Sequence, residues 1–76
     1  MASNISWIAH EERDQHGDCA GTGQWQGRVY HISRLATGNW YCTKTYNGET
    51  TMLTPPGGVH RGNAAWKAAR VDVLSA

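Results

Sequence analysis

The sequence predicts a small α+β domain in which an antiparallel sheet of three to four strands is packed on one face by a C-terminal helix. Asn47-Gly48 separates two segments rich in β-branched and aromatic residues, which is typical of a two-residue hairpin turn. Pro55-Pro56-Gly57-Gly58 then ends the sheet, because proline cannot donate a ladder hydrogen bond. The alanine-rich segment 63–74 follows with apolar residues at helical spacing.

Four segments are predicted to be strands from their alternation of apolar and polar residues and their β-forming composition. They cover about residues 4–11, 24–35, 40–46 and 49–54 of a single domain, 1–76. Residues 14–23 are rich in glycine and polar side chains and are expected to form a loop. A four-residue turn over 36–39 is expected to join the second strand to the third.

The C-terminal helix is predicted to begin at Asn63, whose side chain is suited to cap a helix N-terminus. Ala65, Trp66, Ala69 and Val73 fall within one stripe about 100° wide, the width expected for packing on a sheet. The four tryptophans lie one in each main segment, so each element is expected to contribute one large ring to the core.

The two predicted turns also assign the faces of the sheet, because residues opposite each other in an antiparallel pair point the same way. The turns place Thr43 opposite Met52 and Ile32 opposite Thr43. The predicted buried face is Trp25, Val29, His31, Leu35, Trp40, Cys42, Tyr46 and Leu53. The predicted outer face is Arg28, Tyr30, Ile32, Arg34, Tyr41, Thr43, Thr45, Thr50, Met52 and Thr54. One more residue in either turn would shift the pairing of its two strands by one residue, and this assignment of faces would fail.

Composition favours a cytoplasmic protein that is not inserted in a membrane. No apolar run approaches the roughly 20 residues that a membrane helix needs, and the N-terminus lacks the basic start and apolar core of a secretion signal. Cys19 and Cys42 have no paired spacing, so both are expected to be reduced.

Charge is concentrated in residues 11–18, from the end of the first predicted strand into the loop that follows. Glu11, Glu12, Asp14 and Asp18 stand there against Arg13 alone, a net charge of −3, whereas the whole chain carries +1. A run of charge is most often a solvated loop. The functional interpretation is an acidic arm that docks on a basic surface of a partner, as a nucleic acid would.

Metal, cofactor and catalytic chemistry find little support in the residue spacing. His16 and Cys19 form one close pair, but a structural zinc site usually needs two. Gly21-Thr22-Gly23 matches neither a P-loop nor a dinucleotide fingerprint. No Cys or Ser stands at a catalytic spacing from a His. We therefore expect no metal, no cofactor and no enzymatic activity.

The predicted outer face is the strongest candidate for a binding site, because exposed apolar and aromatic groups beside arginine are enriched at interfaces. An alternative is that another segment of the chain covers this face. The candidate partner-binding residues on the sheet are Arg28, Tyr30, Ile32, Arg34, Tyr41 and Met52. Those of the acidic arm are Glu11, Glu12, Asp14 and Asp18.

The order of elements resembles that of small phage and mobile-element proteins of the anti-CRISPR kind. Its best local parts are Asn47-Gly48 and the segment 63–69, Asn-Ala-Ala-Trp-Lys-Ala-Ala. The resemblance implies a non-enzymatic inhibitor that binds a host protein or nucleoprotein complex. It carries over no specific residue and leaves the oligomeric state open, a homodimer included.

A second resemblance is to sheet-reading DNA-binding domains, such as those at integrase N-termini and AP2 domains. It implies that Arg28, Tyr30, Arg34, Tyr41 and Thr43 read the major groove. The low net charge stands against it. Trp25-Gln26-Gly27 and residues 40–43 are also similar to fragments of the small plasmid-borne trimethoprim-resistant reductases, but the Val-Gln-Ile-Tyr active-site motif of that family is absent. Nucleic-acid binding is thus the alternative to a protein partner.

Overall fold

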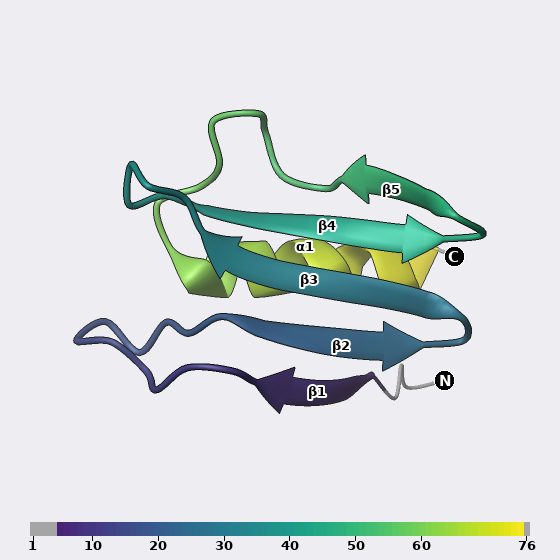
Figure 1. Cartoon of the computed structure of the whole chain (residues 1–76), viewed down its shortest axis with the longest axis horizontal. Coiled ribbons are helices and arrows are strands. Elements are labelled where there is room, and N and C mark those ends of the chain that lie inside the picture. The colour runs from purple at the N-terminus through teal and green to yellow at the C-terminus, as the bar shows by residue number, and fades with distance from the viewer. Residues whose placement is uncertain (1–4, 76) are drawn as a thin grey trace.

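The computed structural model describes residues 5–75, in which five strands are followed by a helix (Figure 1). The elements are β1 (Ser6–Ala9), β2 (Gly21–Trp25), β3 (Arg28–Arg34), β4 (Trp40–Tyr46), β5 (Glu49–Met52) and α1 (Gly62–Ser75). The strands form one antiparallel sheet in sequence order, β1-β2-β3-β4-β5. The predicted α+β class is confirmed, and the predicted three to four strands are corrected to five.

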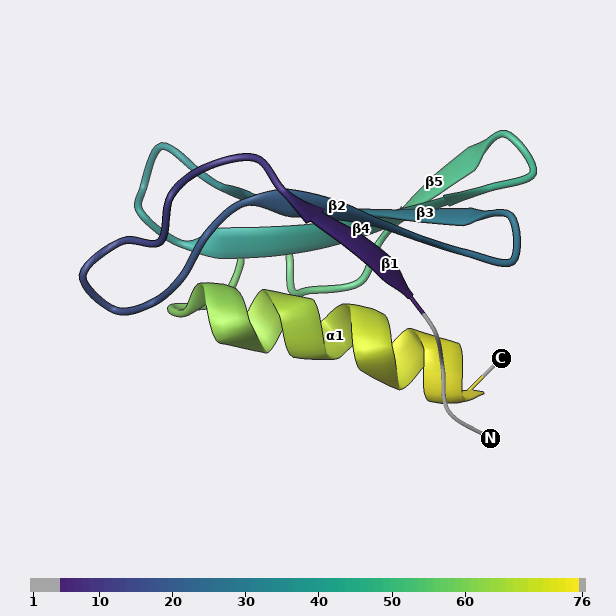
Figure 2. The same ribbon diagram turned by 90° about the horizontal axis from the view of Figure 1, so that it is seen from below.

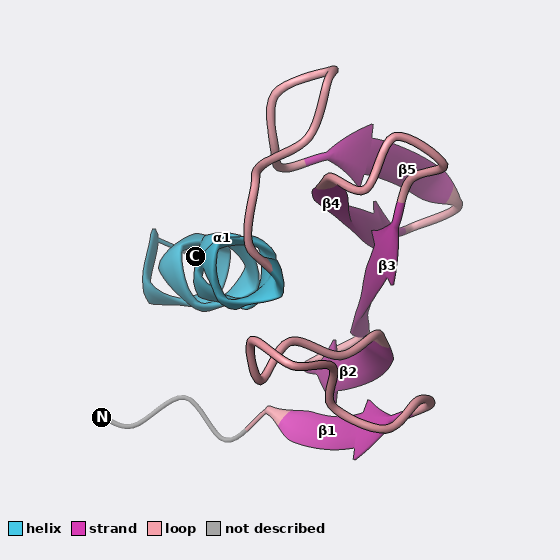
Figure 3. Cartoon of the chain, turned by 90° about the vertical axis from the view of Figure 1, so that its left-hand side faces the viewer, coloured by secondary structure: helices cyan, strands magenta, loops and turns pink. Residues whose placement is uncertain are grey.

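The helix covers one face of the sheet, and within residues 5–75 no other element covers the opposite face (Figure 2). It packs mainly on β3 and β4, and the sheet curves around it (Figure 3). Within residues 5–75 there is no helix with the length and apolar character that crossing a bilayer requires.

The additional strand arises because the predicted strand 24–35 is a hairpin. The chain reverses at Gln26 and Gly27, whose φ angles are 45° and 80°, and Trp25 lies opposite Arg28. Positive φ at two consecutive residues is the requirement of a type I′ turn. The strand before this turn begins at Gly21, so the end of the predicted loop 14–23 is part of β2.

The β4–β5 hairpin forms as predicted. Asn47 and Gly48 have φ angles of 53° and 80°, and Thr43 lies opposite Met52. The strand β5 ends at Met52, two residues earlier than predicted, and Val59 pairs with the backbone of Trp40 in place of β5.

The predicted register between β3 and β4 is wrong by one residue. Arg34, and not Leu35, lies opposite Trp40, and Ile32 lies opposite Cys42 instead of Thr43. The connection therefore has five residues, 35–39, closed by a hydrogen bond of 2.6 Å from the Leu35 N–H to the Asn39 carbonyl. Because side chains alternate along a strand, this shift exchanges the two faces of β3.

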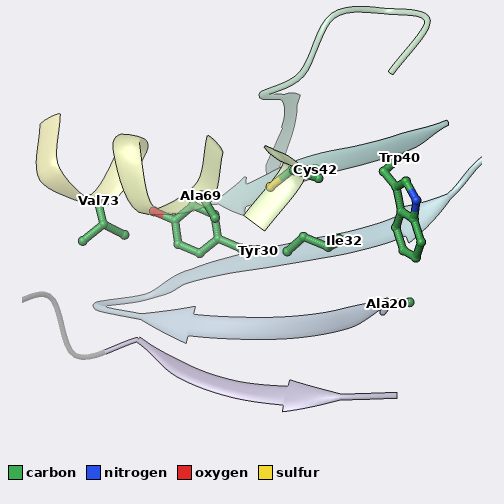
Figure 4. Close-up of a cluster of buried hydrophobic side chains, with 8 residues drawn as sticks. Ala20, Tyr30, Ile32, Trp40, Cys42, Ala69 and Val73 are labelled. Carbon is green, nitrogen blue, oxygen red and sulfur yellow. The ribbon is translucent and has the colours of Figure 1, made fainter. Parts of the chain in front are cut away.

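The core lies between β3, β4 and α1 (Figure 4). Tyr30 and Ile32, which were predicted to face outward, are fully buried there with Cys42. Ala65, Ala69 and Val73 supply the helix side of the contact, as the apolar stripe predicts. Trp40 is buried at one end of this core cluster. The other three tryptophans are half-buried and pack against the cluster: Trp7, Trp25 and Trp66.

The start of α1 is capped by a side chain from the β1–β2 loop and not by Asn63 as predicted. The Asn63 backbone N–H donates to the Asp18 carboxylate over 3.1 Å. Arg61 donates to the other oxygen of the same carboxylate over 2.8 Å. A carboxylate at a helix N-terminus satisfies a free N–H group and interacts favourably with the helix dipole.

Candidate functional site

The uncovered face of the sheet carries one side chain from each strand in a continuous row. The register places Ile8 opposite Thr22, Thr22 opposite His31, His31 opposite Thr43, and Thr43 opposite Met52. The row therefore crosses all five strands. We call the surface built around it the open face.

A second row lies beside the first, and a pair of β3 and β4 residues completes the open face. The second row is Ser6, Gln24, Val29, Thr45 and Thr50, and the pair is Ser33 and Tyr41. Of the side chains that the described strands direct to this face, none belongs to Asp, Glu, Lys or Arg. A sheet face that stays in water usually carries charged residues, so this composition is unusual for a solvated surface.

Several apolar groups on the open face are exposed. Ile8 is 64% exposed, Met52 45% and Val29 36%. His31 and Tyr41 lie beside each other with ring centroids 6.2 Å apart. Exposed apolar and aromatic side chains gathered on one surface are typical of an interaction site.

Hydroxyl groups fill the space between these apolar residues. Thr45 and Thr50 share a hydrogen bond of 2.9 Å across β4 and β5, and Thr22 bonds the His10 ring nitrogen over 3.0 Å. Such pairs hold the side chains in place, so little rotamer entropy is left to lose when a partner binds.

Four of the six partner-binding residues predicted on the sheet are not on this surface, and two of the four are buried. Tyr30 and Ile32 face the helix and have no exposed area. The Tyr30 hydroxyl donates to Asp72 over 2.8 Å, and Lys44 donates to the second oxygen of Asp72 over 3.2 Å. Burial and the hydrogen bond to Asp72 raise the pKa of Tyr30 above its ordinary value. Both side chains hold the helix on the sheet and are inaccessible to a partner.

Tyr41 and Met52 lie on the outer face as predicted, because the Asn47-Gly48 turn fixes the faces of β4 and β5. Arg28 and Arg34 do not lie on the outer face, because they point to the same side of β3 as Tyr30.

The two arginines instead stack on aromatic rings at opposite ends of β3. The Arg28 guanidinium lies 5.0 Å from the Trp25 ring centre and 4.5 Å from that of Tyr46. Arg34 lies 5.6 Å from the Trp40 ring centre and pairs with Asp14 at 4.0 Å. The contacts with the three rings are cation–π interactions, whereas the contact between Arg34 and Asp14 is an ion pair.

The four acids predicted to form a docking arm divide into two pairs. Glu11 and Glu12 are exposed. Asp14 accepts hydrogen bonds from the backbone N–H groups of Asp18 and His16, over 3.0 and 2.8 Å, and the first of these contributes most to the lowered pKa of Asp14. Asp14 thus closes a local turn.

Asp18 is buried, with 1% of its area exposed, in its role as the cap of α1. Burial raises its pKa, but the hydrogen bonds from Arg61 and from the Asn63 backbone outweigh that effect and hold the pKa below the ordinary value. The carboxylate is charged and fully engaged inside the protein. It is therefore not available for docking, contrary to the prediction.

The two thiols are both buried and free. Burial, with a smaller contribution from the charge of Asp72, raises the pKa of Cys42 to about 12. A thiol with so high a pKa is a poor nucleophile at neutral pH. Across residues 5–75, no three His, Cys, Asp or Glu side chains come together as a metal site would require.

The residues of the open face that the sequence prediction missed all lie on β1, β2 and β3: Ser6, Ile8, Thr22, Gln24, Val29, His31 and Ser33. Ile8 stands between Trp7 and Ala9, and the alternation of side chains along a strand places it on the face opposite to theirs. For β3 the sequence does indicate the buried face, because Tyr30 with Ile32 is a more apolar pair than Val29 with His31.

No protein-family model, curated protein or solved structure gives a significant match to this chain.

Proposed function

We propose that this chain is a non-enzymatic binding protein whose open face docks on an uncharged surface of a protein partner. The observation that carries the proposal is the composition of that face: exposed Ile8, Val29 and Met52 lie among hydroxyl groups with no Asp, Glu, Lys or Arg beside them. Depletion of charge together with apolar and aromatic groups distinguishes the centre of protein interfaces from the remaining surface.

The titratable groups with shifted pKa values support a non-enzymatic role. Asp14 and Asp18 fix a turn and the helix start, Tyr30 bonds Asp72, and Cys42 is a buried thiol. Each shift has a structural cause inside the protein. Asp14 and Asp18 line a cavity of about 500 Å³ together with His16 and His60, but hydrogen bonds that fix the loop and the helix start already engage both carboxylates.

A protein partner fits this face better than DNA. A nucleic-acid interface depends on Lys and Arg contacts to phosphates, and the open face has none of either. The resemblance to anti-CRISPR proteins adds that the partner is a host protein, free or within a nucleoprotein complex, which the chain inhibits by covering a surface.

The test compares two substitutions on adjacent residues of β5. Met52→Glu places a charge in the central row of the open face, whereas Thr51→Glu places the same charge on the opposite face, where Lys44 lies across from it. We expect Met52→Glu to weaken partner binding about tenfold or more, because a charge would be desolvated in the interface. Thr51→Glu should bind as the unmodified protein does.

The measurement is quantitative pull-down from a lysate of the host, followed by titration of the purified partner. Equal binding by both variants would refute a role for the open face. Random duplex and single-stranded DNA are titrated in parallel at low salt. Binding that weakens steeply as salt rises would favour the nucleic-acid alternative instead.

A further inference from the structure

A second candidate site lies on the opposite side of the sheet, between β1 and the start of α1. It is a groove of about 300 Å³, lined by Trp7, Arg13, Cys19, Asn63, Trp66 and Arg70. Asn63, Trp66 and Arg70 are three and four residues apart on α1 and so lie along one stripe of the helix. We call this space the indole groove.

Two glycines of β2 make room for its aromatic wall. A Cβ atom at Gly21 would lie 2.6 Å from a ring carbon of Trp66, and one at Gly23 would overlap the ring of Trp7. The Gly21-Thr22-Gly23 segment therefore lets both indoles lie directly against the backbone of β2. Thr22 points to the open face in between.

The two indoles are held in a fixed arrangement. Their ring centres are 4.5 Å apart and their planes meet at 73°, an edge-to-face pair. The Trp66 Nε1–H donates to the Cys19 carbonyl over 2.9 Å. Because this bond satisfies the ring's polar atom, the part of Trp66 that faces the groove is apolar.

The rim of the groove is positively charged. Arg13 donates to the Gly17 carbonyl, which anchors it in the β1–β2 loop without neutralising its charge. Within residues 5–75, neither Arg13 nor Arg70 forms an ion pair, and no Asp or Glu lines the groove. Asp18 at the helix start is already neutralised by Arg61.

We propose that the indole groove binds a small organic anion, in which a flat apolar body packs on Trp7 and Trp66 and an acidic group meets Arg13 and Arg70. An apolar wall with a few converging polar groups is the usual form of a small-molecule site, and the volume lies at the lower end of the usual range. Arginine binds carboxylate, sulfonate and phosphate oxygens with its planar array of N–H donors. This inference is independent of the function proposed for the open face.

Three probes of one shape and different charge test the site: naphthalene-1-carboxylate, neutral 1-naphthalenemethanol and cationic 1-naphthylmethylammonium. Affinities are measured by NMR titration of the full chain, in which the indole N–H signals of the four tryptophans report the position of binding. We expect the carboxylate to bind about tenfold tighter than the alcohol, and the ammonium to bind weakest. The shifts should be largest at Trp7 and Trp66.

Arg70→Gln is the decisive variant, because Arg70 is exposed on the helix and its loss should leave the fold intact. It should reduce the preference for the carboxylate over the alcohol to near unity. Lys67→Gln is the matched control: it removes the same charge from the same helix at a residue outside the groove and should change nothing. Arg13→Gln should act as Arg70→Gln does.

Four results of the probe titrations and the Arg70→Gln variant would overturn the proposal, and a fifth concerns the control. The four are the absence of binding by any probe, equal affinity for the three probes, undiminished preference in Arg70→Gln, or shifts confined to Trp25 and Trp40. The last would place the ligand at another surface. A loss of preference in Lys67→Gln equal to that in Arg70→Gln would show a general effect of net charge and would also refute the site.

Discussion

At the scale of single residues, the fold depends on a few side chains whose partners are remote in sequence. Asp18 accepts from the backbone of Asn63, 45 positions along the chain. Gly23 has no side chain to conflict with the ring of Trp7. Neither role can be recognised from the neighbouring residues, because each is defined by what another element brings to the same place.

Asp18→Asn should destabilise the protein by about 1 to 3 kcal/mol, because the hydrogen bonds from Arg61 and Asn63 lose their charged acceptor. Denaturant unfolding followed by tryptophan fluorescence measures the change. Glu12→Gln, at an exposed residue of the same loop, removes the same charge and should have little effect. Equal stability of the Asp18→Asn variant and the unmodified protein would contradict the role of Asp18.

The lowered pKa of Asp18 predicts that the stability of the protein depends on pH. This pKa is lower in the folded protein than the value of about 3.9 expected in the unfolded chain. The stabilising contribution of the carboxylate is therefore complete above about pH 4 and is lost as the pH falls through the folded pKa. Unfolding free energies measured between pH 7 and pH 2 should fall less steeply for Asp18→Asn. If the unfolding free energies of Asp18→Asn and the unmodified protein fell in parallel with pH, Asp18 would not be the cause of the pH dependence.

Gly23→Ala should cost about 1 to 3 kcal/mol of unfolding free energy, because a methyl group there forces Trp7 or the strand to move. Gly57→Ala is its control, since a Cβ at Gly57 would have no atom within 4 Å. Thermal unfolding compares the two variants. A Gly23→Ala protein as stable as Gly57→Ala would mean that Trp7 does not lie against β2.

At the scale of elements, the sheet is organised by two hairpins that turn at the same end of the molecule (Figure 1). Both turns have positive φ at their two central residues, but one uses Asn47-Gly48 and the other Gln26-Gly27. Asparagine adopts this conformation more readily than glutamine does. The turn at Asn47-Gly48 was therefore evident in the sequence, and the turn at Gln26-Gly27 was not.

Gln26→Asn should stabilise the protein by about 0.5 to 1 kcal/mol by relieving the strain at its φ of 45°. The reciprocal change Asn47→Gln, at a φ of 53°, should destabilise it by a similar amount. Both changes are measured by thermal unfolding. Opposite signs are the expected result, and a loss of stability in both would show that Gln26 has a role beyond the turn.

At the scale of the whole molecule, one helix covers the middle of a five-stranded sheet. The two sides of the sheet therefore carry two different exposed surfaces. The open face is uncharged and hydroxyl-rich, and the indole groove on the helix side is apolar with a basic rim. The core that separates them is limited to β3, β4 and α1 with their neighbours. Edge strands should therefore be less stable than the centre.

Amide hydrogen exchange should be slowest in β3 and β4 and fastest in the two edge strands, β1 and β5, each of which pairs with one neighbour and is largely exposed. Exchange followed by NMR in the native state measures these rates. Protection of the Ile8 amide as strong as that of Ile32 would indicate that another element or a second molecule covers β1.

The sequence by itself determined the α+β class, the helix with its apolar stripe, the strand 40–46 and the hairpin at Asn47-Gly48. These depend on local chemistry: turn residues with particular φ preferences, and periodicity within one segment. Tyr41 and Met52 were placed on the correct face for the same reason.

Tertiary structure decided the register of β3 against β4, the capping of α1 by Asp18, and the glycine positions beneath Trp7 and Trp66. The loop 35–39 has no residue that enforces one length, so its five residues are selected by the burial of Tyr30 and Ile32 against the helix. That single residue of register exchanges the buried and exposed side chains of β3. A site on a sheet face is thus fixed by packing between elements, which no local pattern contains.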